Sequence, residues 1–311
     1  MSDIPTASRV PRISVVVFIL NAASTIDRAL SSVTRDDQPE VELIVMDGGS
    51  TDGTVDIIRR YEPKIAFWRT RRDRGAAAAI NEGVQRATGD IVALLPGDDW
   101  IQPGGVRIVQ EAFRADPELG VLSCGTRFVR AGGAQLEVAK EFLTLRQLEF
   151  TMYNLVRWPL TPARFVKRRY YTELGGYNSA YFISNDLDFL IKVLLKRPRT
   201  KVIPDLVYNF CVHEGSRTLG GGRSTMLEML RGNVGVAEDH LRAPGLTPAE
   251  RAALLGLHGR ASTRLGWMLL SGQDFQSSSR VLMRALQLNW CFPLMVPVWA
   301  AQRALRRDYL F

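Results

Sequence analysis

The sequence predicts an α/β protein with a mostly parallel central sheet, followed by a helical extension. In the first third of the chain, short apolar segments alternate with segments of helical pattern, an order that is typical of βαβ units. The apolar segments show no alternation of polar and apolar residues, as expected for strands that are covered on both faces. The last third of the chain has helical patterns instead.

Strands and helices are expected to alternate along the first part of the chain. The expected strands are "ISVVVFIL" (13–20), "VELIVM" (41–46), "IAFWRT" (65–70) and "DIVALL" (90–95). The expected helices are 24–33, 54–62 and 76–87, the last of them ended by Thr88-Gly89 in the manner of a C-cap. Because a helix connects each strand to the next, the strands are expected to lie parallel.

The composition is that of an ordinary globular chain of 311 residues, 46% hydrophobic and 23% charged. The formal net charge of +8 favours anionic partners such as nucleotide diphosphates, nucleic acid or acidic lipid surfaces. The basic residues are dispersed and are not interleaved with aromatic residues in the RNP manner. Nucleic acid is therefore not an expected partner.

The cysteines and the apolar segments indicate a cellular compartment. Cys124, Cys211 and Cys291 are far apart and form no CxxC pair, so neither a zinc site nor a disulfide framework is supported. A reducing cytosol fits this pattern. The N-terminal "MSDIPTASRVPR" lacks the apolar core of a signal peptide. No apolar segment reaches the roughly 18 residues that a bilayer-spanning helix needs, so a cytoplasmic location is expected.

A glycine-rich segment, "DGGSTDGT" (47–54), follows the second expected strand directly. One interpretation is a strand-to-helix turn, because the glycines tolerate positive φ and Ser50 or Asp52 can cap the next helix. The other interpretation is a ligand-binding loop, since nucleotides bind outside the carboxyl ends of strands in open α/β sheets. In that case Asp47 is a candidate binding residue.

Two adjacent acids, Asp98 and Asp99, follow the fourth expected strand in "PGDDW" (96–100). A solvated turn is one interpretation, because Gly-Asp-Asp is good turn chemistry. A divalent cation is the other, since Mg²⁺ and Mn²⁺ prefer oxygen ligands and usually bind together with substrate phosphates. Because Asp47 also follows a strand, the sheet is expected to gather all three acids on one rim.

Four segments, taken in order, resemble a family 2 glycosyltransferase with the GT-A fold. They are "ISVVVFILNAASTIDRALSSV", "VELIVMDGGSTDGTVDIIRRYE", "RDRGAAAAINEGVQRATGDIVALLPGDDW" and "FVKRRYYTELGGYNSAYFISNDLDFLIKV". Their order and spacing carry the resemblance, which covers roughly residues 11–215. It implies a GT-A glycosyltransferase domain over 1–215 that transfers a sugar, with inversion, from a nucleotide donor with the help of Mn²⁺ or Mg²⁺.

The resemblance implies donor-binding roles for four polar residues. Asp47 matches the acid that binds the donor base, where a carboxylate can accept the uracil imide N–H. Asp73, in "RRDRG", matches a polar position near the base and the ribose. Asn21 and Asn81 lie at two further positions of the family pattern and are expected to contact the donor.

The resemblance implies a metal site around Asp98 and Asp99, which match the end of the family's metal motif. Asp98 is also expected to contact the donor through the cation that bridges the diphosphate. His213, in "CVHEGSRT", is a further candidate metal ligand, with a hydrogen-bonding surface histidine as the alternative. Arg217 is expected to pair with a donor phosphate, with a solvated arginine as the alternative. Trp100 is expected beside the donor sugar or in the core.

The sequence departs from the family pattern at three positions. Leu20 replaces an aromatic residue that would pack on the base, and Ile80 stands where many relatives have an arginine. Pro96 replaces the first acid of the metal motif. These departures bear on the identity of the donor more than on the reaction.

Asp186, in "NDLD", matches the catalytic base of the family, and Asp188 matches a neighbouring acid. In an inverting transfer an acceptor hydroxyl attacks the anomeric carbon opposite the leaving diphosphate, and Asp186 takes the hydroxyl proton. The alternative is that both acids only stabilise the start of the helix "DLDFLIKVLL". We predict that Asp186, and not Asp188, is the base.

The rest of the chain, 216–311, is expected to be a helical extension. Thr247 and Glu250 form a capping-box pattern before one helix, and 274–288 predicts a second. The end of the chain, from Trp290 onward, joins apolar and aromatic residues to arginines. It is expected either to cover the catalytic domain or to lie on a membrane, where arginines meet anionic headgroups.

These observations predict a hexosyl- or N-acetylhexosaminyltransferase that uses a nucleotide-sugar donor. The expected donor is a UDP-sugar. The expected acceptor is a hydroxyl of a glycan or lipid-linked molecule, in surface polysaccharide or glycolipid synthesis at the inner face of the cell membrane. The alternative is a non-catalytic sugar-nucleotide-binding protein, since Leu20 and Pro96 weaken two donor contacts. A nucleotidyltransferase would need a glycine-rich, basic first loop, which "NAASTIDRAL" does not supply.

Overall fold

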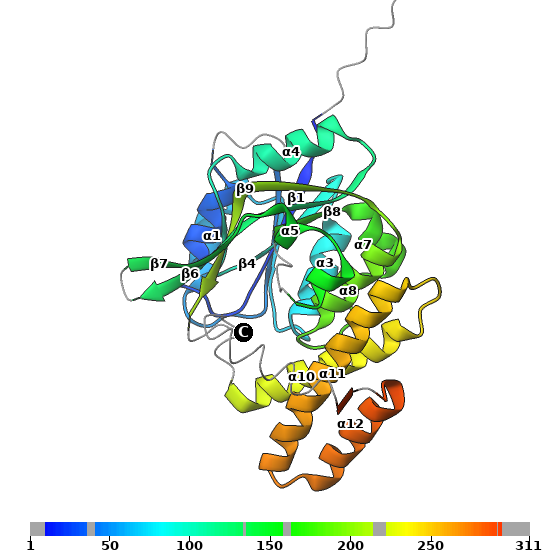
Figure 1. The fold of residues 1–311 in the computed structure, drawn as a ribbon. Helices are drawn as coiled ribbons and strands as arrows, with labels where there is room; N and C mark the ends of the chain where they lie inside the picture. The colour runs from blue at the N-terminus through cyan, green and yellow to red at the C-terminus, as the bar shows by residue number, and fades with distance from the viewer. Residues whose placement is uncertain are drawn as a thin grey trace, which may run out of the picture.

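A computed structural model describes residues 10–35, 41–132, 135–157, 163–213, 222–290 and 292–293. A curled nine-stranded sheet forms the centre of the molecule, and helices cover both of its faces (Figure 1). Three helices near the C-terminal end pack together beside it. The α/β class and the helical extension that the sequence predicts are therefore confirmed.

The sheet has the order β3-β2-β1-β4-β8-β6-β9-β5, and β7 pairs with β6. Its strands are β1 (Ile13–Ile19), β2 (Val41–Asp47), β3 (Phe67–Thr70), β4 (Ile91–Pro96), β5 (Trp100–Ile101), β6 (Leu119–Gly132), β7 (Gln135–Phe142), β8 (Arg164–Lys167) and β9 (Arg199–Val212). The first four strands confirm those expected from the sequence to within a few residues.

The two halves of the sheet differ in strand direction. Strands β3, β2, β1 and β4 are parallel, as predicted. In the other half β8 runs antiparallel to β4 and β6, and β6 pairs parallel with β9 but antiparallel with β7. The sheet is therefore mixed, and the prediction of a mostly parallel sheet holds for the half that contains β1 to β4. Strand β6 lies between β8 and β9, and β9 lies between β6 and the two-residue strand β5, which pairs antiparallel with it.

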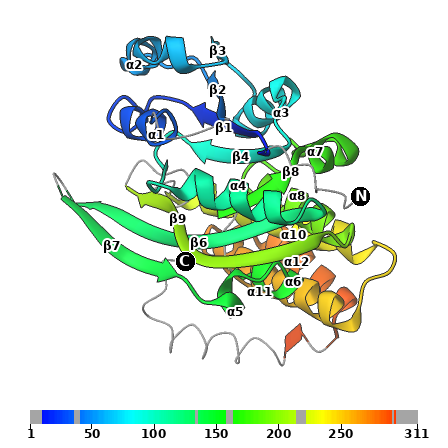
Figure 2. The same ribbon diagram turned by 90° about the horizontal axis from the view of Figure 1, so that it is seen from above.

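Helices connect and cover the strands. They are α1 (Ile26–Val33), α2 (Thr54–Arg60), α3 (Ala76–Arg86), α4 (Gly105–Ala115), α5 (Leu145–Leu148), α6 (Met152–Leu155), α7 (Arg168–Leu174), α8 (Asn185–Leu195), α10 (Gly222–Leu241), α11 (Pro248–Ser271) and α12 (Phe275–Leu288), with a short 3₁₀ turn, η1 (Glu62–Lys64). Figure 2 shows α1 and α2 on one side of the parallel strands and α3 on the other.

Alternate residues of β1 build two separate cores. Val15 and Val17 pack with α1 and α4 on one face of the sheet, whereas Val16 packs with α3 and α8 on the other. All three valines are fully buried. This explains why the segment is apolar without alternation, since successive side chains of a strand point to opposite faces.

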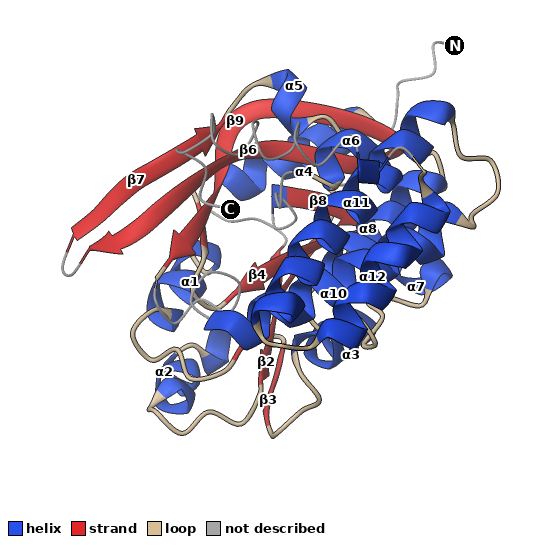
Figure 3. Ribbon diagram, turned by 60° about the horizontal axis from the view of Figure 1, so that its bottom comes forward, coloured by secondary structure: helices blue, strands red, loops and turns tan. Residues whose placement is uncertain are grey.

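The extension continues the core on the α8 face. Val236 of α10 and Leu254 of α11 belong to the same buried apolar cluster as Phe189 of α8, and Figure 3 shows α10 beside α8. Helix α11 begins with the predicted capping box, in which Thr247 and Glu250 each bond the other's backbone N–H. The expected division near residue 215 falls between β9 and α10, and apolar packing crosses it.

Candidate active site

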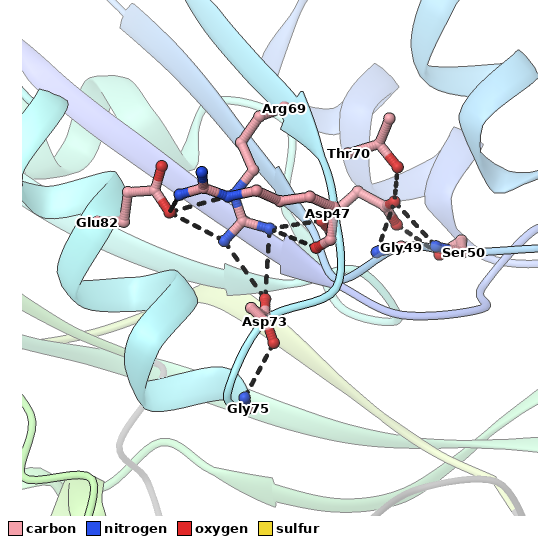
Figure 4. A network of polar contacts seen from close by, with 9 residues as sticks. Asp47, Gly49, Ser50, Arg69, Thr70, Asp73, Gly75 and Glu82 are labelled. Atoms are coloured by element: carbon pink, nitrogen blue, oxygen red, sulfur yellow. Dashed lines mark hydrogen bonds and ion pairs between the residues drawn. The ribbon is translucent and has the colours of Figure 1, made fainter.

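Asp47 ends β2 and organises the loop that follows it (Figure 4). Its carboxylate is completely buried. Oδ2 accepts hydrogen bonds from the backbone N–H groups of Gly49 and Ser50, both at 3.0 Å, and from Thr70 Oγ1 at 2.5 Å, while Ser50 Oγ donates to Oδ1. Gly49 has a φ of +89°, and a Cβ there would lie 2.9 Å from the Arg72 nitrogen. The Asp47 carboxylate therefore fixes the loop, and both of its oxygens already accept hydrogen bonds from the protein.

Asn21 ties the end of β1 to the same loop. Its side-chain Oδ1 accepts from Thr51 N at 2.9 Å, and its own N–H donates to Ser50 Oγ at 2.7 Å. The φ of Asn21 is +50°, a left-handed conformation that asparagine tolerates better than most residues. Asn21 and Asp47 thus shape one rim loop from two neighbouring strands.

Asp73 lies beside this loop because Arg69 holds it there. The Arg69 guanidinium lies 3.3 Å from Asp73 Oδ2 and 3.2 Å from Glu82 Oε2, and it donates to the Asp47 carbonyl at 2.6 Å. The second oxygen of Asp73 accepts from Gly75 N at 2.9 Å. Arg69 is 11% exposed, so this ion-pair network is largely shielded. Arg69 was not singled out from the sequence, and because residues 69–73 form a strand end and a loop, the four-residue spacing to Asp73 is no signal of an ion pair.

Asp47→Asn is expected to lower the free energy of unfolding by about 1–3 kcal/mol, because the new amide group would face N–H and O–H donors. Urea unfolding measures this change. Thr70→Val removes a single donor, leaves the carboxylate in place and is expected to cost less. Nucleotide affinity, measured by calorimetry on the folded variant, should also fall. An unchanged affinity would remove Asp47 from the base pocket.

Asp98 and His213 come together at the carboxyl end of β4. Asp98 Oδ2 lies 3.0 Å from His213 Nε2, and the two side chains are 28% and 31% exposed. The residues come from positions far apart in the sequence, and β9 brings His213 to this edge of the sheet. A carboxylate and an imidazole that converge and remain accessible suit a divalent cation whose other ligands are phosphate oxygens and water.

Asp99 points the other way, into the core. Its oxygens accept hydrogen bonds from Tyr208 Oη at 2.5 Å and from the backbone N–H of Cys211 at 2.8 Å. Burial, and after it the neighbouring Asp98 carboxylate, raises the pKa of Asp99 well above its usual range. Asp99 therefore joins the loop to β9. Within the described residues no group of three or more His, Cys, Asp or Glu side chains is arranged to hold a metal.

Arg28 of α1 braces the Asp98 loop and was not singled out from the sequence. Its Nη2 donates to the Asp98 carbonyl at 3.4 Å. Its guanidinium lies 4.0 Å from the centre of the Trp100 ring, a cation–π contact. Trp100 therefore has a structural partner, and a place beside the donor sugar stays a prediction.

Asn81 of α3 holds the turn that precedes α8. Its Nδ2 donates to the Tyr177 carbonyl at 2.8 Å, and its Oδ1 accepts from Tyr177 N at 2.7 Å. Both polar atoms of the amide are used in this pair. A direct contact between Asn81 and the donor stays a prediction, and Arg217 lies outside the described residues.

Asp186 lies in the first turn of α8 and is partly exposed. Its Oδ1 accepts from the Leu187 N–H at 2.7 Å. Asp188, two residues on, is buried between Lys192 Nζ at 2.6 Å and His240 Nε2 at 2.9 Å. Burial opposes the ionisation of Asp188, but the bonds from His240 and Lys192 outweigh it, so its pKa is lowered. The two acids therefore differ: Asp188 is enclosed by partners and Asp186 is accessible.

Helix α10 fixes the loop that leads into α8, the helix whose first turn contains Asp186. Ser184 Oγ donates to Asn233 Oδ1 at 2.9 Å, and Tyr181 Oη donates to Asp239. A Cβ on Gly232 would lie 2.7 Å from Ser184 Oγ, and one on Gly235 would lie 3.0 Å from a Tyr181 ring carbon. Both glycines therefore permit a close approach of α10 to the start of α8.

A family model described as Glycosyl transferase family 2 matches residues 14–172, just over half of the chain. The chain belongs to glycosyltransferase family 2. The match contains the loop after β2 and the acidic pair after β4. Asp186 and His213 lie beyond the matched residues, so the roles proposed for them depend on the sequence resemblance and on the geometry of the structure.

Curated relatives of this family 2 glycosyltransferase include synthases and a glycolipid enzyme. Hyaluronan synthase from Pasteurella multocida is 25% identical over 218 residues, which cover 66% of this chain and 21% of that protein. A PGL/p-HBAD biosynthesis glycosyltransferase from Mycobacterium bovis is 30% identical over 190 residues, 58% of this chain and 69% of that protein. The chain thus spans about a fifth of the length of the hyaluronan synthase.

Solved structures share the fold of this glycosyltransferase. The mannosyltransferase PcManGT from Pyrobaculum calidifontis, in complex with GDP-Man and Mn²⁺, matches with a TM-score of 0.58 and 21% identity. This match covers 98% of the present chain and 84% of the PcManGT chain. Residues 1–349 of TarS from S. aureus, in complex with UDP-GlcNAc, match with a TM-score of 0.56 and 18% identity. This match covers 91% of the present chain and 92% of the TarS chain. The GT-A expectation is therefore confirmed.

Proposed function

We propose that the protein transfers a sugar, with inversion, from a UDP-sugar to a hydroxyl of a glycan or lipid-linked acceptor. One observation carries the proposal: the Asp98–His213 pair lies at the carboxyl end of β4, on the sheet edge that also holds the Asp47 loop. In open α/β sheets this edge is the usual place for a nucleotide. The Asp47 loop and Asp73 would border the base and ribose, and Asp98 would lie next to the diphosphate.

Mn²⁺ or Mg²⁺ fits the Asp98–His213 pair as a cofactor. These two residues would hold it, and the cation would neutralise charge on the departing diphosphate. The presence of Mn²⁺ with GDP-Man in the PcManGT structure supports this proposal. We assign Asp99 to holding the loop, because Tyr208 and Cys211 occupy its oxygens.

Asp186 is proposed as the general base. The acceptor oxygen forms a bond to the anomeric carbon, the bond from that carbon to the diphosphate breaks, and the hydroxyl proton passes to the Asp186 carboxylate. A partly exposed carboxylate at a helix start can meet an acceptor from solvent, whereas the enclosed Asp188 cannot.

A donor panel tests the proposal and the type of sugar. The full chain is incubated with Mn²⁺ and with UDP- or GDP-linked hexoses and N-acetylhexosamines, and nucleotide release is followed by mass spectrometry. Release from a UDP-sugar, enhanced by an acceptor, is expected. Binding of a nucleotide-sugar without any release across the panel would favour a non-catalytic binding protein.

The extension is proposed to contact a membrane surface, as expected for an enzyme with a lipid-linked acceptor. Large apolar side chains of α11, of α12 and of the segment just after α12 are exposed: Trp267 (70%), Phe275 (63%), Met283 (57%) and Trp290 (81%). Aromatic residues favour the bilayer interface, and the net charge of +8 favours anionic headgroups. No described helix is long and apolar enough to cross a bilayer.

Replacing Trp267 and Trp290 together with serine is expected to weaken association with anionic liposomes at least tenfold, because burying one large apolar side chain contributes about 1.5–3 kcal/mol. Liposome flotation measures the change, and UDP binding should stay intact. Serines at the exposed Leu136 and Val138 of β7 are the matched control. Equal flotation of both double variants would contradict the membrane proposal. Unfolding after deletion from Trp290 onward would instead show that this segment covers the core.

A further inference from the structure

Arg164, the first residue of β8, is buried without hydrogen bonds. The residue is 4% exposed, and its Nε, Nη1 and Nη2 atoms have no hydrogen-bond partner among the described residues. Its guanidinium lies over the Phe150 ring, 5.5 Å from the ring centre. Buried charges are normally paired, because an unpaired one costs several kcal/mol. The position therefore needs an explanation that packing alone does not give.

The Arg164 side chain remains charged at neutral pH. Burial lowers its pKa to about 10, and the nearby Asp186 carboxylate acts in the opposite direction. A guanidinium presents five N–H donors in a planar fork and accepts no hydrogen bonds. The charge and the donors of Arg164 are thus available for an acceptor group that the described residues do not supply.

A second polar group without a hydrogen-bond partner lies opposite Arg164. Ser123 of β6 is the register partner of Arg164, and its buried Oγ also has no hydrogen-bond partner within the described part of the chain. Directly opposed residues of neighbouring strands share one face of the sheet. Val166, two residues after Arg164, packs in the cluster that contains Phe189 of α8. Arg164 and Ser123 therefore face the side of the sheet that carries α8 and Asp186.

We infer that Arg164 and Ser123 form an oxyanion-binding subsite beside Asp186 for a carboxylate or phosphate group of the acceptor. The planar fork of arginine matches either anion, and the serine hydroxyl adds a donor. The positive charge of Arg164 also offsets the repulsion between an anionic acceptor and the Asp186 carboxylate. Both groups are shielded from solvent in this structure, so the anion enters when neighbouring side chains shift. The acceptor assignment rests on the proposed glycosyl transfer, whereas the anion site itself does not.

Thermal unfolding of the full chain tests the subsite with inorganic phosphate and with glucuronate as probes. Ionic strength is held constant with NaCl, and saturating UDP with Mn²⁺ fills the donor site. Both anions are expected to raise the Tm of the wild type. Arg164→Met should weaken the binding of the anion about ten- to hundredfold, as loss of a charged hydrogen bond does. Arg164→Lys should retain part of the binding, and Ser123→Ala should weaken it less.

Controls keep the outcomes separate. Arg164→Met should fold about as stably as the wild type, because it replaces a buried charge that has no hydrogen-bond partner among the described residues by an apolar side chain. Ser262→Ala removes another buried hydroxyl without a hydrogen-bond partner among the described residues, in α11, and should bind the anions normally. Equal anion shifts in the wild type and Arg164→Met, or no shift in the wild type, overturn the proposal. The change in Tm caused by UDP and Mn²⁺ without added anion reports on the donor site, independently of the anion subsite. A stronger response to glucuronate indicates an acidic sugar, and a stronger response to phosphate indicates a phosphate-linked acceptor.

Discussion

Asp186→Asn is expected to abolish sugar transfer while leaving donor and metal binding intact. Asparagine is nearly isosteric with aspartate, so the first turn of α8 keeps its packing. An amide cannot accept the proton of the acceptor hydroxyl at neutral pH, and loss of a general base costs roughly 10²–10⁴-fold in rate. Transfer is measured at saturating donor, with UDP affinity determined on the same preparation.

Asp188→Asn is the matched control. Its carboxylate is bonded to Lys192 and His240, so this variant should lose about 1–3 kcal/mol of stability while retaining more transfer activity per folded molecule. An inactive Asp188→Asn beside a fully active Asp186→Asn would show that the base is assigned to the wrong acid. Normal turnover by both variants would rule out the mechanism proposed for this helix.

Asp98→Ala is expected to remove the metal dependence of UDP binding. In the EDTA-treated wild type, UDP should raise the Tm more when Mn²⁺ or Mg²⁺ is added, because Asp98 and His213 lie ready for a cation. The variant should give the same smaller shift with and without metal. Calorimetry with Mn²⁺ should show at least a roughly tenfold weaker UDP affinity, since even second-shell changes at metal sites cost 10–100-fold.

Asp99→Asn separates the two neighbouring acids. This variant should lose stability, because Tyr208 and Cys211 need the carboxylate as an acceptor, yet it should keep a metal-dependent shift. A wild type that responds equally to UDP with and without metal would argue against any metal site here. Loss of metal dependence in Asp99→Asn alone would assign the ligand to Asp99.

The parallel half of the fold could be predicted because its pattern is local. Each strand from β1 to β4 is a short apolar run, and the connecting helices follow within a few residues. The mixed half depends on pairings between distant segments, such as Ser123 with Arg164 and Cys124 with Ile203. No local pattern states which of these segments pairs with which, or in which direction.

In the candidate site, too, the residue types could be predicted from local sequence, whereas their partners depend on distant segments. Asp98 and Asp99 have the same chemistry and adjacent positions, and the groups that bind the buried Asp99, the Tyr208 hydroxyl and the Cys211 N–H, come from far along the chain. The family resemblance identified Asp186, but the partners that separate it from Asp188 come from α8 itself and from α10. Arg164 gave no signal, because a single arginine in an apolar strand indicates an edge or a surface position as readily as a buried site.

Gly232 and Gly235 of α10 limit how residues 1–215 can be recombined with other helices. Gly232 and Gly235 leave room for Ser184 and Tyr181, so the backbone of α10 lies directly against the loop that leads into α8. A chimera that grafts another relative's extension onto residues 1–215 would bring larger side chains to these positions unless it keeps both glycines. Such a chimera should bind donor normally and transfer sugar poorly. Substitutions within the extension that keep both glycines should therefore disturb the start of α8 less than exchange of the whole segment.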